Sequence, residues 1–428
     1  MKQLKQGITG LVVLYAQLAL VRAGETISID GAFGPQTERA VQSFQEQNHL
    51  TPDGIVGPKT WMRLYPYLTG YTLHEVQAGD TFYAIARRYG STVESIRIAN
   101  PDAAEQMLQI GEILTVPLPF PVSTWDVPYS SLLNGLVLEG LRARYPKLGI
   151  ASFGTSVLGR SMLSATVGTG TAAVGINAAH HANEWITTPL VLRMLESYLY
   201  AEAYGKPFYG FDTAELIAST RLVLVPLVNP DGVDLVTGYL EANEPAFQRA
   251  MGFAGDYPRI PFPSGWKANL NGVDLNLGYP AGWDRARELK FAEGYTRPGP
   301  RDYVGTAPLN EPENIAMARL TEADRYRLTV SYHTQGAELY WRYLGEAPAG
   351  AAKIVEAFAS ASGYAVADPA QFSSYAGYKD WFIDAFDRPG FTVEAGRGQN
   401  PLPTGALGQL YRENIGIFAN SLALATDA

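Results

Sequence analysis

The segment Ala172-Ala-Val-Gly-Ile-Asn-Ala-Ala-His-His-Ala-Asn-Glu184 joins an apolar run to two histidines and a glutamate. Residues 172–177 have the length and composition of a strand that is buried on both faces. His181 stands three residues before Glu184, so a turn that enters a helix can aim both side chains at one point. Imidazole and carboxylate are ligands that zinc accepts. The segment therefore predicts a buried strand that ends at part of a metal site.

Similar apolar runs occur at 222–228, 328–332 and 391–393, separated by helical stretches, and this alternation predicts an α/β fold. His333 follows the second of these runs directly and supplies a candidate third ligand. The chain has five histidines and no cysteine, so any metal must be held by imidazole and carboxylate. His180, adjacent to His181, is expected to be a neighbour of the site rather than a ligand.

Composition limits the classes of protein that need to be considered. The chain has 428 residues, of which 46% are hydrophobic and 18% charged, which is typical of about three globular domains rather than of disorder. A net charge of −9 argues against nucleic acid as a partner. No apolar run reaches the ~18 residues that a membrane span needs.

The sequence 11–21 suggests either a signal peptide or a core-facing helix through Leu11, Leu14, Leu18 and Val21. The helix is favoured because no convincing cleavage site follows.

A repeat occupies the first sixty residues. Asp30-Gly-Ala-Phe-Gly-Pro-Gln-Thr37 recurs as Asp53-Gly-Ile-Val-Gly-Pro-Lys-Thr60, each with a glycine turn followed by proline at a helix start. With Trp61, this pattern resembles the peptidoglycan-binding type 1 domain and predicts a three-helix module over residues 1–67. The alternative is a helical spacer without a ligand.

A second small module is expected over residues 71–118. A strand, a helix from Phe82, a helix from Thr92 and a strand that ends at Pro117 follow one another, and Asp80 or Thr81 is the expected cap of the first helix. The arrangement resembles a LysM domain with βααβ order. That resemblance implies binding of N-acetylglucosamine-containing glycans beside the two turns that contain Gly79, Asp80, Thr81 and Asn100. The linker 117–121 is rich in proline, so it is expected to be extended.

Further motifs follow the histidines in a fixed order. They are Asn229-Pro-Asp-Gly232, Gly272-Val-Asp-Leu-Asn276, Ser331-Tyr-His333 and Phe391-Thr-Val-Glu394. Together with H-x-x-E, this set resembles the M14 zinc carboxypeptidase family over residues 122–428. The resemblance implies a twisted mixed sheet flanked by helices, with one Zn²⁺ bound at the strand ends.

The family motifs assign roles to individual residues. His181, Glu184 and His333 match the zinc ligands, and Asp274 matches the aspartate that receives the N–H of the first histidine. Glu394 matches the catalytic carboxylate, which takes a proton from the attacking water and passes it to the leaving amine. Lys267 falls where the family usually has an arginine that supports the oxyanion; the alternative for Lys267 is an exposed surface lysine.

Two positions depart from the pattern of the digestive family members. After Asn276, Leu277 replaces the arginine that binds the substrate's C-terminal carboxylate, which removes an anchor worth about 1.5–3 kcal/mol. Lys379 stands at the side-chain specificity pocket, where a cation favours an anionic substrate group. The alternative is that Lys379 points to solvent or pairs with Asp380 or Asp384. Tyr375 matches the family's mobile tyrosine only loosely, because its loop is short.

The whole chain resembles one branch of this family, the γ-D-glutamyl-diaminopimelate endopeptidases of spore-forming bacteria. The resemblance implies a wall-acting bacterial zinc peptidase with peptidoglycan glycan strands and stem peptides as partners, and hydrolysis of the γ-D-glutamyl–meso-diaminopimelate bond. Spore-associated release or an unrecognised export route is expected, because no clear export signal is present. The alternatives are an ordinary metallocarboxypeptidase that removes C-terminal residues and an inert wall-binding protein.

Overall fold

The computed structural model describes residues 2–104, 107–370 and 374–428. The chain divides into two compact units, one comprising 1–128 with 135–149 and the other 129–134 with 150–428. Helix α6 (Ser131–Arg144) begins in the second unit and continues in the first. Among the described helices, none is long and apolar enough to cross a membrane.

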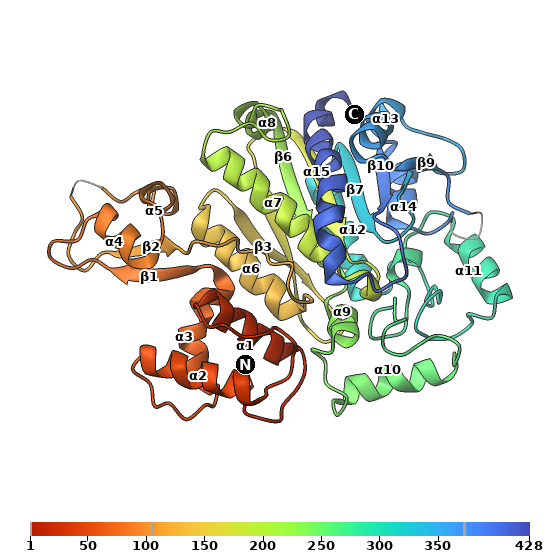
Figure 1. Cartoon of the computed structure of the whole chain (residues 1–428). Helices are drawn as coiled ribbons and strands as arrows, with labels where there is room; N and C mark the ends of the chain where they lie inside the picture. The colour runs from red at the N-terminus through yellow and green to blue at the C-terminus, as the bar shows by residue number, and fades with distance from the viewer. Residues whose placement is uncertain (1, 105–106, 371–373) are drawn as a thin grey trace. The chain divides into compact units, whose positions relative to one another are not determined.

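The first unit begins with a three-helix module, as the repeat predicts (Figure 1). Its helices are α1 (Leu11–Arg22), α2 (Pro35–Gln47) and α3 (Pro58–Thr69), and proline is the first residue of both α2 and α3. Helix α1 is buried over more of its circumference than a single apolar stripe would be. Val13, Tyr15 and Gln17 are buried, whereas Leu14 is half-buried and Val21 is 36% exposed. The expected core position at Val21 is therefore wrong, and Leu14 is only partly in the core.

Each copy of the repeat closes around one buried glutamine. In the second copy, the Gln45 amide donates to Asp53 Oδ1 (2.8 Å), Ile55 O (3.0 Å) and Thr60 Oγ1 (3.0 Å), and its Oε1 accepts from Gly54 N (3.0 Å). In the first copy, Gln17 makes the matching bonds to Asp30, Ala32, Thr37 and Gly31. In both copies the aspartate and the threonine of the repeat accept hydrogen bonds from a glutamine on the preceding helix.

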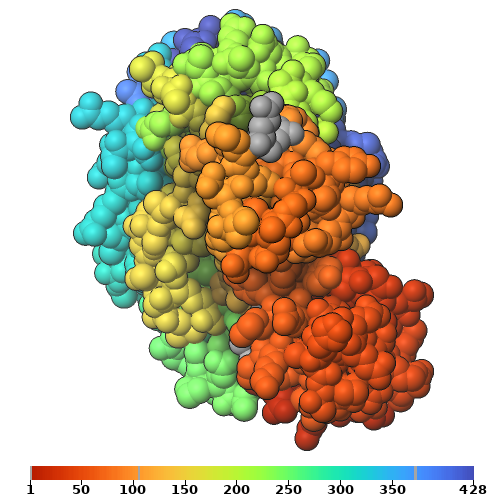
Figure 2. Space-filling model, turned by 90° about the vertical axis from the view of Figure 1, so that its left-hand side faces the viewer, coloured from red at the N-terminus to blue at the C-terminus, as the bar shows by residue number. Residues whose placement is uncertain are grey.

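The second module of this unit has the βααβ order that the sequence predicts. Strand β1 (Tyr71–Glu75) pairs antiparallel with β2 (Ile113–Pro117), and helices α4 (Phe82–Tyr89) and α5 (Val93–Ala99) lie between them in the chain. Thr81, not Asp80, caps α4 by accepting a hydrogen bond from Ala84 N. Figure 2 shows the exposed surface of this module in orange and that of the helical module in red.

Within the described part of the second unit, eight strands form one mixed sheet in the order β3-β4-β6-β5-β7-β10-β8-β9. Their bounds are β3 (Gly149–Thr155), β4 (Ser161–Val167), β5 (Ala172–Ala178), β6 (Thr220–Val225), β7 (Leu328–His333), β8 (Glu338–Tyr340), β9 (Ala365–Ala367) and β10 (Gly390–Glu394). The four expected runs are β5, β6, β7 and β10. Strand β6 ends at Val225 rather than at residue 228, since Pro226 has no N–H for the ladder.

Helices cover both faces of this sheet (Figure 1). Ala173 and Val223 pack against Phe382 of α14, while the alternate residues of β5 and β6 point to the opposite face, where α7 and α15 lie. The helices of this unit are α7 (Thr187–Ala203), α8 (Thr213–Ser219), α9 (Pro230–Thr237), α10 (Pro245–Gly255), α11 (Trp283–Ala292), α12 (Pro312–Asp324), α13 (Ala351–Ser362), α14 (Tyr378–Phe386) and α15 (Leu407–Ala423).

The buried glutamine of the repeat can be tested by substitution. We expect Gln45→Met to lower the free energy of unfolding of the first unit by about 2–3 kcal/mol, because it leaves the Gly54 N–H without its side-chain acceptor and removes the hydrogen bonds that Gln45 donates to Asp53 and Ile55. Gln47→Met, on the exposed face of the same helix, should cost less than about 0.5 kcal/mol. Urea unfolding and amide exchange at Gly54 measure the difference, and equal effects of the two substitutions would contradict the network's role.

Candidate active site

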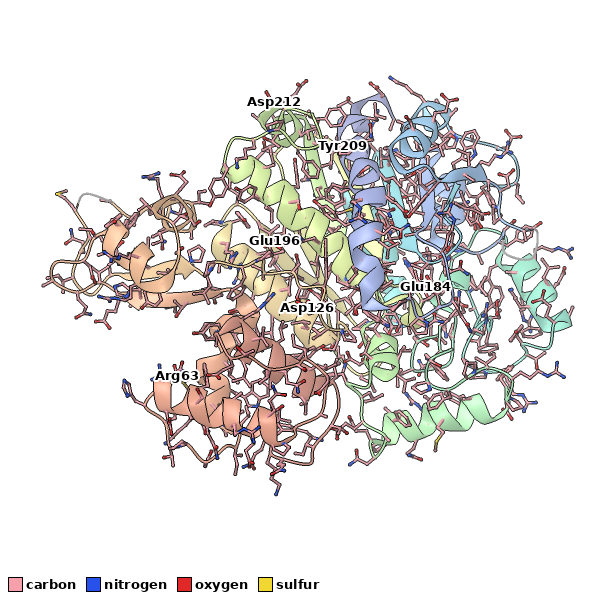
Figure 3. The ribbon with its side chains drawn as sticks, viewed as in Figure 1. Arg63, Asp126, Glu184, Glu196, Tyr209 and Asp212 are labelled. Carbon is pink, nitrogen blue, oxygen red and sulfur yellow. The ribbon has the colours of Figure 1, made fainter. Side chains whose placement is uncertain are left out.

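Three side chains converge at the carboxyl end of the central strands. His181 Nδ1 lies 2.9 Å from Glu184 Oε1, and His333 Nδ1 lies 2.9 Å from Glu184 Oε2 and 3.2 Å from His181 Nδ1. Glu184 is in η1 (Ala182–Glu184), which follows β5 (Figure 3). At most one proton can lie between two facing imidazole nitrogens, whereas a cation would satisfy both nitrogens and the carboxylate. The donor set and its spacing therefore fit zinc.

His180 points away from this cluster. Its Nε2 lies 3.1 Å from the hydroxyl of Tyr279, its ring stacks on His333, and the residue is fully buried. Burial and the neighbouring imidazoles hold the pKa of His180 well below its usual value. His180 is therefore placed as a neutral packing partner behind His333.

Asp274 fixes the orientation of His181 from the other side of the ring. Asp274 Oδ1 lies 3.2 Å from His181 Nε2, which leaves His181 Nδ1 facing Glu184. Although burial opposes it, the charges of Glu184 and Asp274 raise the pKa of His181 to about 9. Zinc must displace that proton, so metal binding is expected to strengthen as the pH rises.

Lys267 and Glu394 lie in the same cavity as the cluster. Lys267 Nζ is 3.0 Å from Glu184 Oε1, and its side chain is only 18% exposed, so the alternative of a solvated surface lysine is wrong. Glu394 ends β10 and pairs in register with His333. Burial and the charge of Glu184 raise the pKa of Glu394 to about 8, and a cation held by Glu184 would lower it again.

This cavity has a volume of about 330 Å³, and charged side chains of both signs line it. Asn276 lines it and accepts from Tyr378 N at 3.0 Å, which ties Asn276 to the start of α14. Leu277 also lines it and offers it no charged group. Lys379 lines it too, but its ammonium donates to Asp380 and to Arg342 O. The structure thus shows the pairing with Asp380 that the sequence left open.

Tyr375 lies apart from the zinc cluster. It lines a neighbouring cavity with Arg342 and Asp368, and it packs against Leu277 and Trp283. Among the described residues that line the zinc cavity, Tyr375 does not occur. Substrate binding by Tyr375 therefore stays a prediction without support from the geometry.

Side chains in the turns of the LysM-like module form hydrogen bonds with the main chain of the same module. Asp80 Oδ2 accepts from Gln77 N and contacts His74, and Asn100 bonds the main chain of Ile96 and Thr115. Gly79 has a φ of +87°, which favours glycine. These contacts explain the residue types without a glycan, so glycan binding by Gly79, Asp80, Thr81 and Asn100 stays a prediction.

Three charged residues of the cavity were missed in the sequence. Lys290, Arg301 and Asp302 line it, and Asp302 pairs with both cations. Arg301-Asp302 is an adjacent pair of opposite charges in a loop with no spacing motif. The only signal was its place between two glycine- and proline-rich stretches after Asp274.

Comparison with known families assigns the second unit. The zinc carboxypeptidase (M14) profile matches residues 136–415. The chain belongs to the zinc carboxypeptidase family. The peptidoglycan-binding domain profile matches residues 9–64, and the LysM domain profile matches residues 74–117. The family resemblances drawn from the motifs are confirmed, and with them a zinc-dependent hydrolase.

Individual relatives agree with this assignment. Over 297 residues the chain is 42% identical to gamma-D-glutamyl-L-diamino acid endopeptidase 1 of Lysinibacillus sphaericus, covering 69% of this chain and 72% of that protein. It is 40% identical over 280 residues to the uncharacterized protein YqgT of Bacillus subtilis, covering 65% and 73%. Carboxypeptidase A of Helicoverpa armigera shares the fold at a TM-score of 0.54 and 18% identity, covering 92% of this chain and 88% of its own.

The metal ligands of this zinc carboxypeptidase can be separated from their neighbour by substitution. We expect His181→Ala to lose zinc, because it removes one of three converging donors, and His180→Ala to retain about one zinc per chain despite a lower thermal stability. Metal analysis after dialysis measures the content. Added zinc should raise the Tm of the wild type and of His180→Ala but not of His181→Ala. The opposite pattern would overturn the ligand assignment.

Proposed function

We propose that this zinc carboxypeptidase-family enzyme hydrolyses the γ-D-glutamyl–meso-diaminopimelate bond of peptidoglycan stem peptides. The observation that carries the proposal is the 42% identity to gamma-D-glutamyl-L-diamino acid endopeptidase 1 across most of the catalytic region. Peptidoglycan-binding and LysM domains in the same chain support a wall substrate. The charged lining of the cavity suits a substrate that carries several carboxylates.

The side chain of Leu277 argues against the alternative function, that of an ordinary carboxypeptidase. Its side chain is buried, packs against Trp283 and Val304, and faces the cavity. An apolar side chain here offers no charge to a substrate's C-terminal carboxylate, so the enzyme lacks the anchor that selects a chain end. An endopeptidase does not need that anchor.

His181, Glu184 and His333 would hold the zinc ion, which supplies Lewis-acid polarisation and a bound water of lowered pKa. Glu394 takes a proton from the water that attacks the γ-carbonyl carbon. When the C–N bond breaks, Glu394 gives that proton to the departing amine of diaminopimelate, so the products are a carboxylate and an amine. Lys267, whose ammonium already faces Glu184, stabilises the negative charge on the carbonyl oxygen.

Lys379 remains our proposed contact for the D-centre carboxylate of diaminopimelate. An ammonium has three N–H donors, and two of those of Lys379 go to Asp380 and Arg342 O. The third has no acceptor among the residues that the structure describes, and the cavity that Lys379 lines can supply one from a substrate. Because Asp380 already balances the charge, the gain from this contact is smaller than that of an unpaired cation would be.

The two small modules are proposed to keep the enzyme on its insoluble substrate. The LysM turns that contain Gly79, Asp80, Thr81 and Asn100 would contact N-acetylglucosamine of the glycan strand. Binding to the wall raises the local concentration of stem peptides at the catalytic unit. The inert wall-binding alternative is disfavoured because the zinc-ligand positions and Glu394 are all occupied by residues that suit catalysis.

Cleavage of a defined stem peptide tests the function. We expect L-Ala-γ-D-Glu-meso-diaminopimelate to yield L-Ala-D-Glu and free diaminopimelate, identified by mass. Glu394→Gln should lower kcat at least about a thousandfold and keep one zinc per chain, because it removes the proton carrier and no ligand. Release of a C-terminal residue in place of these products would overturn the proposal in favour of a carboxypeptidase.

A second substitution tests the diaminopimelate contact. We expect Lys379→Met to lower kcat/KM about tenfold on diaminopimelate stems, about 1.4 kcal/mol, and much less on stems with lysine at that position, which lack the D-centre carboxylate. Since Asp380 loses its partner, the Tm of the variant is measured alongside. An equal loss on both substrates would assign Lys379 to the structure of α14 rather than to the substrate.

A further inference from the structure

Four lysine and arginine side chains line the zinc cavity: Lys267, Lys290, Arg301 and Lys379. In three of them, the lysines, the terminal ammonium contacts a carboxylate of the protein. Lys267 Nζ lies 3.0 Å from Glu184, Lys290 Nζ lies 2.8 Å from Asp302, and the Lys379 ammonium pairs with Asp380. Each of these three cations therefore has its charge balanced at the tip of its side chain.

Arg301 differs because its ion pair is made by Nε, the guanidinium nitrogen nearest the main chain, and not by a terminal nitrogen. Its Nε lies 2.6 Å from Asp302 Oδ2, and its side chain is 41% exposed. Within the described residues, the two terminal nitrogens of Arg301 have no hydrogen-bond partner. Asp302 is itself held by Lys290 and, through its own N–H, by Asp274 Oδ2 at 3.1 Å. The guanidinium is thus oriented from behind, and its two outer N–H groups remain for a carboxylate.

The loop that carries Arg301 is fastened to Lys267. Pro300 O accepts from Lys267 N at 2.7 Å and from Ala268 N at 3.0 Å. Lys379 instead belongs to α14, whose first turn is tied to Asn276. Arg301 therefore shares the part of the cavity lining that holds Lys267, whose ammonium is placed for the scissile carbonyl, and not the part that holds Lys379.

We propose that Arg301 determines specificity by binding the α-carboxylate of the D-glutamyl residue, on the acyl side of the scissile bond. This inference rests on the proposed function. A γ-linked D-glutamate keeps its α-carboxylate free, and that group lies three carbons from the carbonyl that is attacked. An ordinary peptide has no carboxylate at this place. A paired carboxylate and guanidinium next to Lys267 would then select γ-glutamyl over α-peptide substrates.

Two stem tripeptides that differ at one group test this directly: one with D-glutamate and one with D-isoglutamine, in which the α-carboxylate is a neutral carboxamide. We expect the wild type to prefer the carboxylate form at least about tenfold in kcat/KM, since a charge-assisted bidentate contact is lost in the amide. Arg301→Gln should lower kcat/KM about 10- to 100-fold on the carboxylate form and change the carboxamide form less than about threefold. Arg301→Lys should restore part of the preference, because it restores charge without the fork.

Arg297→Gln is the matched control. Arg297 is 65% exposed, pairs with Asp256 outside the cavity and lies on the same loop, so its loss should leave both substrates unaffected. Zinc content and Tm are measured for each variant. A wild type that cleaves both forms equally, or an Arg301→Gln loss that is equal on both, would overturn the assignment of Arg301 and leave the proposed function standing. A wild type that releases no diaminopimelate from either form would overturn the proposed function, and the assignment with it.

Discussion

The site depends on three parallel strands that stop at the same level of the sheet. Strands β5, β7 and β10 are adjacent, and Ala178 pairs with Tyr332 while Glu394 pairs with His333. Neighbouring strands lie about 4.8 Å apart, so residues at or just after their ends fall within one small volume. Buried on both faces, these strands cannot slip in register without placing polar side chains in the core. The register that positions His333 and Glu394 is therefore set by packing far from the site.

This constraint explains why much of the site could be predicted from the sequence. His181 and Glu184 lie three residues apart on one turn, and His333 and Glu394 end apolar runs whose strand character is clear. The repeat around Asp30 and Asp53 is local as well, although its partner glutamines were not recognised, because each is on a preceding helix. Local spacing carries such features, since the turn that uses them is built from neighbouring residues.

Features that depend on the approach of distant loops were not predictable in the same way. Helical spacing predicts Val21 as a core position, but Val21 is exposed. The elements that pack on α1 decide which of its faces is buried, and the spacing within α1 does not specify them. For Lys379 the sequence allowed pairing with the nearby Asp380 but gave no sign of the hydrogen bond to Arg342 O, a contact that spans 37 positions in the sequence. Arg301 and Lys290 are brought together by Asp302, which pairs with both. No periodicity encodes these pairings, because they arise from how loops fold over the end of the sheet.

The position of the anchoring cation decides which kind of peptidase the family fold becomes. In digestive members an arginine follows the asparagine equivalent to Asn276 and binds the free end of the chain, so the substrate must stop at that residue. Here that position is Leu277, buried against Trp283. In the proposed assignment Arg301, whose outer nitrogens have no hydrogen-bond partner in the described part of the chain, binds a carboxylate on the acyl side instead. Because nothing then requires a free carboxylate at the L-centre of the departing residue, a stem peptide that continues past diaminopimelate is accepted. A guanidinium on the leaving-group side of the scissile bond selects substrates that end there. A guanidinium on the acyl side would instead select substrates with a γ-glutamyl linkage.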